Sequence, residues 1–269
     1  MNFRKYLALT RLGMMEKLHY RLGTFVTLFG NLIYLVLIYF LWKAIYASSG
    51  SDVVNGMTLN DTLVYLVLAT ALFNFLEVFL VWDMSREIQS GSIVLKLLKP
   101  MSFRGYSFWS YIGENIMSFF LTFLPTFIII NILTKGSIAL SVNLIFFVVS
   151  VIMALVINFS IDMIVATICL YTESTWGLNM VKESIVLLLS GASIPLAFFP
   201  ETLRKLVQYL PFRCIYDMPL NVLLQKPGYT LGSGLVFTLL LQLAWCLALT
   251  AVGSVFWNFS LKKITVNGG

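Results

Sequence analysis

The chain has 269 residues, of which 59% are hydrophobic and only 11% are charged, and its formal net charge is +6. Soluble domains carry roughly 25% charged residues, and a soluble core of this length cannot bury so much apolar surface. The composition therefore excludes an ordinary soluble protein. It predicts an all-α integral membrane protein with about six transmembrane helices, at ~20 residues a span.

The N-terminal segment 1–22 is basic and mixed in polarity. On a helical wheel Leu7 and Leu18 fall on one side, whereas Lys5 and Glu16 fall on the other. This pattern is typical of a helix that lies in the membrane interface. A plain basic tail that leads into the first span is the alternative interpretation.

Six apolar runs then follow, and short polar segments separate them. The expected spans are Thr24–Ala47, Thr62–Trp82, Ile112–Leu133, Val142–Leu170, Ser184–Phe199 and Ser233–Phe256. Pro125 is expected to kink the third span. Ser48–Asn60 is rich in Ser, Gly, Asn and Asp and predicts a loop, and Tyr171–Glu183 predicts a polar connection. A single transmembrane domain, 1–269, fits this pattern better than two domains.

The charged segment 83–100, between spans two and three, is the most informative part of the sequence. Its apolar residues Ile88, Leu95 and Leu98 form a strip beside charged residues. A helix with apolar anchors and a charged rim predicts a docking surface for another protein. A helix packed against the membrane interface is the alternative. The candidate docking residues are Arg86, Glu87, Ile88, Gly91, Leu95, Leu98 and Lys99.

Segment 190–227, which contains the end of span five and the residues after it, is predicted to form an element on the outer side of the membrane. Span five is only ~24 Å long at 1.5 Å per residue, shorter than ~30 Å of hydrocarbon, which predicts a segment that stops part-way and re-enters. The apolar spacing of Glu201–Leu210 indicates a short surface helix that packs against this span. The candidate residues of this outer cap are Pro195, Pro200, Leu203, Leu206, Val207, Leu210 and Pro211.

The candidate pathway residues are two asparagines and two carboxylates within predicted spans two and four: Asn74, Glu77, Asn158 and Asp162. Carboxylates in lipid are expensive and usually face a bundle interior or water. Glu77 and Asp162 therefore predict either a polar conduit or hinge, or a structural hydrogen-bonding pair.

The distribution of Lys and Arg predicts the orientation, because cations are enriched on the cytoplasmic side. With both termini in the cytoplasm, twelve of the eighteen Lys and Arg lie inside. The other six are Lys43, Lys135, Arg204, Lys205, Arg213 and Lys226. The expected location is the cytoplasmic membrane.

Catalysis finds little support in the sequence. The only histidine is His19, and no metal-ligand cluster, nucleophile elbow or phosphate-binding glycine loop is present. The three cysteines have no paired spacing. We therefore expect no metal, no cofactor and no enzymatic activity in this chain.

Three stretches together resemble a permease of the type-2 ATP-binding-cassette (ABC) exporter family. They are the basic segment that ends at Tyr20-Arg21, the inner segment Ile88…Gly91…Leu98-Lys99-Pro100, and the outer segment Ile194-Pro195…Phe199-Pro200…Leu210-Pro211-Phe212. The resemblance implies that 83–100 is a coupling helix, and that the segment after span five forms re-entrant helices that cap the pathway.

The resemblance also implies partners and a function. Cytoplasmic ATPase subunits, with their ATP and Mg, would sit on separate chains, and a second permease would complete the pathway in the lipid bilayer; no nucleic acid is expected. The cargo would be amphipathic, such as a drug, peptide or lipid, and would move by alternating access. A secondary transporter or channel without an ATPase is the alternative, and an intramembrane enzyme or scaffold is a third.

Overall fold

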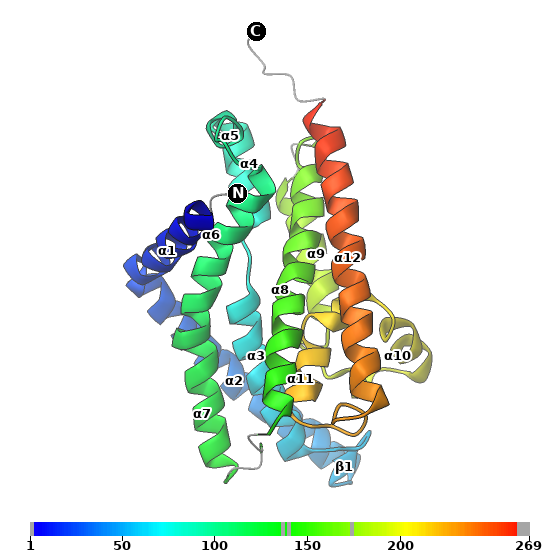
Figure 1. Ribbon diagram of the computed structural model, residues 1–269. Coiled ribbons are helices and arrows are strands. Elements are labelled where there is room, and N and C mark those ends of the chain that lie inside the picture. The colour runs from blue at the N-terminus through cyan, green and yellow to red at the C-terminus, as the bar shows by residue number, and fades with distance from the viewer. Residues whose placement is uncertain (1–2, 136–137, 139–140, 173–174, 263–269) are drawn as a thin grey trace.

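The computed structural model describes residues 3–135, 138, 141–172 and 175–262. Apart from one short hairpin, its elements are helices (Figure 1). In chain order they are α1 (Phe3–His19), α2 (Arg21–Ser49), β1 (Val53–Val54), β2 (Met57–Thr58), α3 (Leu59–Leu76), α4 (Leu80–Gln89), α5 (Ile93–Leu97), α6 (Phe103–Ser118), η1 (Phe119–Phe123), α7 (Leu124–Leu133), α8 (Asn143–Ile168), α9 (Thr175–Leu189), η2 (Leu196–Phe198), α10 (Glu201–Val207), η3 (Pro211–Cys214), α11 (Asp217–Leu223) and α12 (Ser233–Leu261).

Five helical segments of the described chain are long and apolar enough to cross a membrane, which confirms the all-α membrane class. These segments are Leu22–Ser49, Leu59–Gln89, Phe103–Leu133, Asn143–Ile168 and Ser233–Leu261. They correspond to predicted spans one, two, three, four and six. The fourth segment lies within its predicted run, whereas the other four extend beyond theirs at one end or at both.

The core lies where α8 packs between α12, α11, α3 and α4 (Figure 1). Helix α11 is buried almost along its whole length. A larger apolar cluster fills the half of the bundle near the hairpin, and a smaller one surrounds Met84, Met163 and Trp257 near the other end. Helix α8 contributes to both clusters and therefore joins the two halves.

Helix α1 crosses α6 with the two backbones in direct contact. A Cβ added to Gly13 would lie 2.3 Å from the Ser110 carbonyl oxygen, and one added to Gly113 would lie 2.1 Å from that of Thr10. Only glycine allows so close an approach. Leu7 and Leu18 of α1 are exposed, and the location of this helix in the membrane interface stays a prediction.

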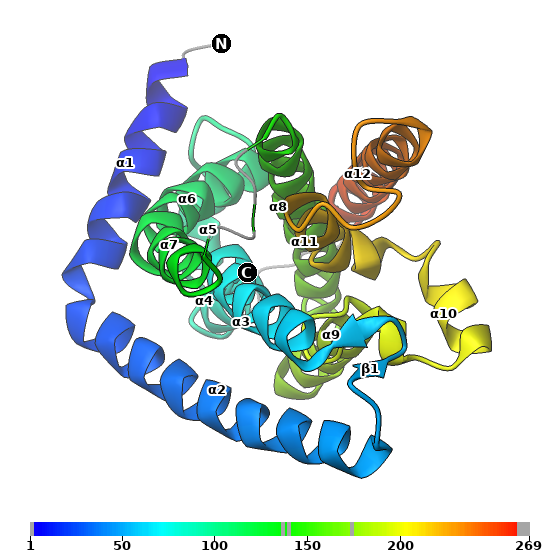
Figure 2. The same cartoon turned by 90° about the horizontal axis from the view of Figure 1, so that it is seen from below.

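Helix α2 runs along one side of the bundle and makes few contacts with it. Figure 2 shows α1 and α2 following two adjoining sides of the group formed by α3, α6 and α7. None of the most apolar stretch of α2 is buried within the chain. Its apolar side chains therefore need a cover of lipid or protein.

Two local devices explain where α3 begins. The predicted loop Ser48–Asn60 contains the hairpin β1–β2, whose turn residues Asn55 and Gly56 both have positive φ, as a tight two-residue hairpin turn requires. Thr58 then caps α3: its side chain accepts from the Asp61 amide, and the Asp61 carboxylate accepts from the Thr58 amide. This capping box satisfies amides that would otherwise have no partner.

Span three is longer than the apolar run. Helix α6 begins at Phe103 because the Ser102 hydroxyl caps it by accepting from the Gly105 amide at 3.2 Å. Before Pro125, the chain forms the π-helical turn η1. Proline lacks an amide hydrogen, and such a turn re-satisfies the backbone groups that it frees.

The fifth predicted span is placed differently by the structure. The predicted span is Ser184–Phe199, but α9 begins at Thr175, within the predicted polar connection Tyr171–Glu183, and ends at Leu189. The turn Ser190–Gly191 and the short helices η2, α10, η3 and α11 follow it. The correction has a physical cause, because Lys182 finds a buried carboxylate and so can enter a helix within the bundle.

Candidate functional site

The predicted second span is broken at Glu77. Helix α3 ends at Leu76, Glu77 has an extended backbone, and α4 begins only at Leu80. A helix end leaves carbonyl groups without partners, which is costly within a membrane. The sequence predicts Glu77 within one continuous helical span, whereas in the structure Glu77 lies in the interruption between α3 and α4.

Two asparagines satisfy the carbonyls at this break. The Asn158 amide donates to the Leu76 carbonyl at 2.8 Å, and the Asn115 amide donates to the Phe75 carbonyl and to that of Glu77. Asn158 comes from α8 and Asn115 from α6, so three helices meet at the break. Asn74 instead donates to the Thr70 carbonyl one turn earlier in α3.

Asp162 belongs to an ion pair with a residue that the sequence did not single out. The Lys182 ammonium of α9 lies 2.7 Å from the Asp162 carboxylate of α8, and only 1% of the Asp162 side chain is exposed. Glu183 lies 4.0 Å from the same ammonium. A small cavity of about 30 Å³ joins this pair to Glu77 and Asn158.

The inner segment 83–100 forms two helices rather than one. Helix α4 ends at Gln89, Gly91 turns the chain with a φ of 72°, and α5 follows. A Cβ at Gly91 would meet no atom within 4 Å, so the turn rather than crowding explains the glycine. Instead of one continuous docking helix, the segment therefore forms a helix–turn–helix unit, which we call the α4–α5 unit (residues 80–99).

The docking candidates on this unit divide into two groups. Leu95 is 68% exposed and Leu98 is 76% exposed, and Arg86 and Lys99 are also exposed. By contrast, Ile88 packs against the smaller apolar cluster, and Glu87 forms an ion pair with Lys96 across the turn. Ile88 and Glu87 therefore hold the unit together, and the exposed residues form its outer surface.

The base of the α4–α5 unit is tied to three other helices. The Tyr111 hydroxyl of α6 donates to Asp83, and Ser85 bonds the Thr175 hydroxyl of α9 at 2.7 Å. Met84 is buried against α8 residues in the smaller apolar cluster. A force on the exposed end of the unit would therefore reach α6, α8 and α9.

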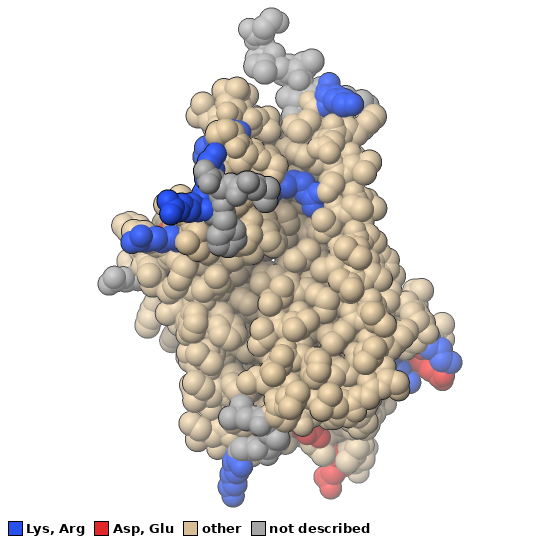
Figure 3. All heavy atoms as spheres, viewed as in Figure 1, with Lys and Arg blue, Asp and Glu red and all other residues tan. Residues whose placement is uncertain are grey.

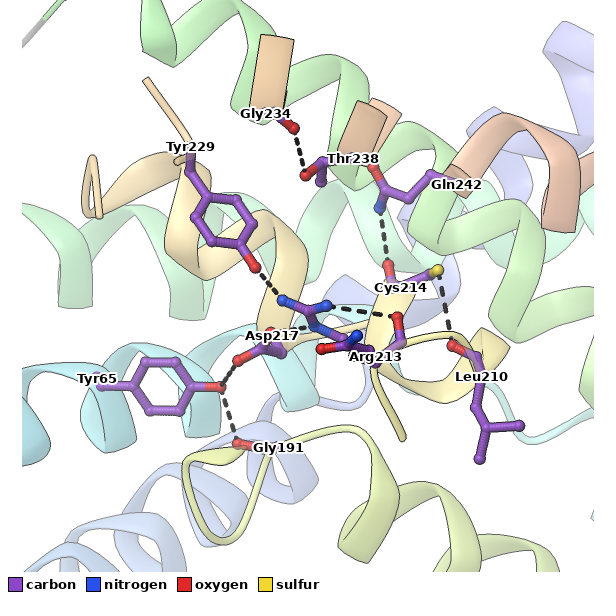
Figure 4. A network of polar contacts seen from close by, with 11 residues as sticks. Tyr65, Gly191, Leu210, Arg213, Cys214, Asp217, Tyr229, Gly234, Thr238 and Gln242 are labelled. Atoms are coloured by element: carbon purple, nitrogen blue, oxygen red, sulfur yellow. Dashed lines mark hydrogen bonds and ion pairs between the residues drawn. The ribbon is translucent and has the colours of Figure 1, made fainter. Parts of the chain in front are cut away.

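The outer segment closes around Arg213, as Figure 4 shows. The guanidinium of this residue donates to Asp217 at 2.8 Å and to the Tyr229 hydroxyl. Burial raises the pKa of Tyr229 to about 12, so its phenol stays protonated. Asp217 also accepts from Tyr65 of α3 at 3.4 Å, and the network thus joins α3, η3, α11 and the loop before α12.

Further bonds attach the same segment to its neighbours. The Tyr65 hydroxyl donates to the Gly191 carbonyl at 3.0 Å, and Gln242 of α12 donates to the Cys214 carbonyl at 2.8 Å (Figure 4). Gly191 has a φ of 82°, and a Cβ there would lie 2.9 Å from the Tyr65 hydroxyl. Glycine is needed at this corner for both reasons.

The predicted packing of the outer helix is correct for one residue. Val207 is completely buried, whereas Leu206 is 62% exposed and Leu203 is also exposed. Leu210 lies half-buried beyond the end of α10. Helix α10 contacts the rest of the protein mainly through Val207. The spacing of apolar residues therefore predicted more buried residues than the structure has. Pro195, Pro200 and Pro211 each precede or begin one of the short helices.

Charged side chains lie toward two ends of the molecule. Figure 3 shows Lys and Arg around the end formed by α1, α5 and the close of α12, and a second group at the opposite end and on α10. Between them the visible face is almost free of charge (Figure 3). An uncharged band between two charged ends is typical of a membrane-spanning protein.

Sequence reasoning missed the residues that complete the polar contacts, namely Asn115, Lys182, Tyr65, Arg213, Asp217 and Gln242. A weak signal existed for Asn115 and Gln242, which are polar residues inside apolar runs. The buried position of Lys182 could not be predicted, because the polar stretch Tyr171–Glu183 is typical of a connection between spans.

Comparison with models of protein families identifies a related family. The model of a family described as ABC-2 family transporter protein matches residues 32–268, which is nearly the whole chain. No curated protein sequence matches the chain.

Proposed function

The chain belongs to the ABC-2 transporter family, and from this premise we propose that it is the membrane-spanning subunit of an ATP-driven exporter. The sequence has no phosphate-binding glycine loop, so ATP and Mg bind to separate ATPase subunits. The permease itself is not an enzyme. A second permease chain, either another copy or a related protein, completes the pathway through the cytoplasmic membrane, and both termini are cytoplasmic.

The observation that carries the proposal is the exposed apolar surface of the α4–α5 unit. Leu95 and Leu98 are exposed, and α5, to which Leu95 belongs, lies at the end of the molecule near α1 (Figure 1). Large exposed apolar residues flanked by Arg86 and Lys99 are suited to a groove on a partner protein. The ion pair between Glu87 and Lys96 keeps the two helices of the unit in one arrangement.

The contacts of α4 support its role as a lever. ATP-driven closure of the ATPases pushes the α4–α5 unit, and the bonds of Asp83 to Tyr111 and of Ser85 to Thr175 pass the movement to α6 and α9. The break at Glu77 separates α4 from α3, so α4 can tilt without carrying all of α3 with it. Alternating access of the pathway follows from this movement.

The outer segment acts as the cap of the pathway, and α9 together with η2–α11 forms the re-entrant element and sixth crossing. The hydrogen bonds of Arg213 and Asp217 connect the outer segment to α3. Helix α3 precedes the break at Glu77, and α4 follows it. The cargo is amphipathic, such as a drug, a peptide or a lipid, because few charges line the apolar helices.

Purification from native membranes tests the proposal. The full chain carrying an affinity tag is solubilised in mild detergent, and co-purifying subunits are identified by mass spectrometry. We expect an ATPase with a nucleotide-binding site and ATP hydrolysis that orthovanadate inhibits. A homogeneous preparation of the chain without any ATPase would overturn the proposal and favour a channel or secondary transporter.

A further inference from the structure

Two adjoining cavities beside α1 collect a large share of the carboxylates of the chain. The first, of about 490 Å³, lies between α1, the start of α2 and the helices α3, α4 and α6. The second, of about 290 Å³, lies between α1, α4 and α6 and shares Glu16, Asp83 and Glu114 with the first. We call the two together the acidic vestibule.

Five of the twelve acidic residues of the chain line this vestibule, against three cations. The acidic residues are Glu16, Glu77, Asp83, Glu87 and Glu114, and the cations are Lys17, Arg86 and Lys96. The chain as a whole carries a net charge of +6, so the local excess of negative charge is opposite in sign to that of the protein. A concave surface lined by one sign of charge attracts ligands of the other sign.

Three of these carboxylates have no partner in the described chain. Asp83 accepts from Arg86 and Tyr111, and Glu87 pairs with Lys96. Neither an ion pair nor a hydrogen bond holds Glu16, Glu77 or Glu114 among the described residues. Like charges around one cavity repel each other, and a bound cation would remove this repulsion.

Two buried polar atoms also lack partners here. Ser107 is 3% exposed and lines the second cavity, and its hydroxyl makes no hydrogen bond in the described chain. The Oε2 atom of Glu87, in the same cavity wall, is likewise unpaired. An unpaired buried polar atom is costly, and an N–H donor placed in the cavity would satisfy both atoms.

The acidic vestibule also has apolar lining residues. Tyr20, Phe79 and Leu121 line the first cavity together with the carboxylates.

At the outer segment a cavity of about 300 Å³ is lined by three cations, Arg204, Arg213 and Lys226, and by one carboxylate, Asp217. A cation is therefore attracted at the vestibule and repelled at the outer cavity.

We propose that the acidic vestibule receives amphipathic organic cations, molecules with an ammonium head and an apolar body, as the substrates of the exporter. The head lies among Glu16, Glu77 and Glu114, and the apolar body lies along Tyr20, Phe79 and Leu121. This inference rests on the proposed function, and the difference in charge between the two cavities favours release on the outer side.

A matched pair of fluorescent probes tests the inference on the unaltered protein. The full chain, with any ATPase that co-purifies, is placed in nanodiscs of zwitterionic lipid. Dansylcadaverine carries an ammonium group, and 6-dansylaminohexanoic acid carries a carboxylate on a similar linker. We expect saturable binding of the ammonium probe, above that of empty nanodiscs, and none of the carboxylate probe. Equal binding of both probes, or of neither, would overturn the inference.

Single substitutions locate the site. Glu77→Gln and Glu114→Gln keep the shape and remove one charge each, and each should weaken binding of dansylcadaverine about tenfold, equivalent to ~1.4 kcal/mol. Asp52→Asn, in the exposed loop before β1, is the matched control and should leave binding unchanged. Unaltered affinity in both glutamine variants, with elution volumes like that of the wild type, would place any cation site elsewhere.

The ATPase readout separates this inference from the proposed function. If ATP hydrolysis is present but dansylcadaverine neither binds nor stimulates it, the cation inference is wrong and the exporter proposal stands. If no ATPase co-purifies but the ammonium probe binds in a Glu77- and Glu114-dependent way, the vestibule binds cations and the exporter proposal fails.

Discussion

The side-chain amide of Asn158 on α8 lies 2.8 Å from the carbonyl oxygen of Leu76, the last residue of α3. This bond closes one helix with a side chain from another at the point where the second span breaks. A buried carbonyl without a partner costs ~1–3 kcal/mol. The break can therefore persist within the bundle only while such donors are present.

Asn158→Leu keeps the approximate size of the side chain and removes the donor. We expect the free energy of unfolding to fall by ~1–3 kcal/mol, because the Leu76 carbonyl stays buried without a bond. The measurement is the thermal midpoint in detergent. Asn60→Leu, at an exposed position near the start of α3, is the control, and an unchanged midpoint for Asn158→Leu would show that the bond is dispensable.

The ion pair of Asp162 and Lys182 calls for a double-mutant cycle. Lys182→Met leaves the buried Asp162 carboxylate unpaired, which should cost ~3–5 kcal/mol, and Asp162→Asn leaves the Lys182 ammonium with only Glu183, 4.0 Å away, and should cost less. The double variant has neither charge and should recover much of the loss. Thermal midpoints of the four proteins give the coupling. If the two single losses simply add, the residues do not stabilise each other and a role in transport becomes the better explanation of Asp162.

The outer helix offers two neighbouring residues with opposite exposure. Val207→Asp buries an unpaired carboxylate and should cost several kcal/mol, because the charge has no compensating partner. Leu206→Asp places the same group at an exposed position and should leave the thermal midpoint almost unchanged. Similar midpoints for both variants would contradict the orientation of α10.

Apolar run length predicted most of the fold. The five long helices have apolar runs of sufficient length, and α8 and α12 begin within one residue of the predicted spans. Run length could not find the start of α9, because Lys182 and Glu183 look like solvent-exposed residues until the position of Asp162 is known.

The sequence indicated the candidate site only in part. Leu95 and Leu98 are exposed, as a docking strip requires. Ile88 instead packs against the smaller apolar cluster. Glu87 pairs with Lys96, which the turn at Gly91 brings close to it. A single helical wheel cannot represent a chain that turns at a glycine with positive φ. The vestibule was not foreseen, because its carboxylates come from α1, α4, α6 and the break at Glu77.

Docking of an ATPase on the α4–α5 unit is the central claim, and site-specific crosslinking tests it most directly. A photoreactive amino acid is introduced at Leu95 or Leu98, which are exposed and whose replacement should not disturb the fold. Leu231, equally exposed in the loop before α12, carries the same amino acid as the control. We predict that irradiation of native membranes yields a covalent adduct with an ATPase from Leu95 and Leu98 and none from Leu231. Adducts with the ATPase from Leu231 alone, or from none of the three positions while the ATPase still co-purifies, would contradict the claim.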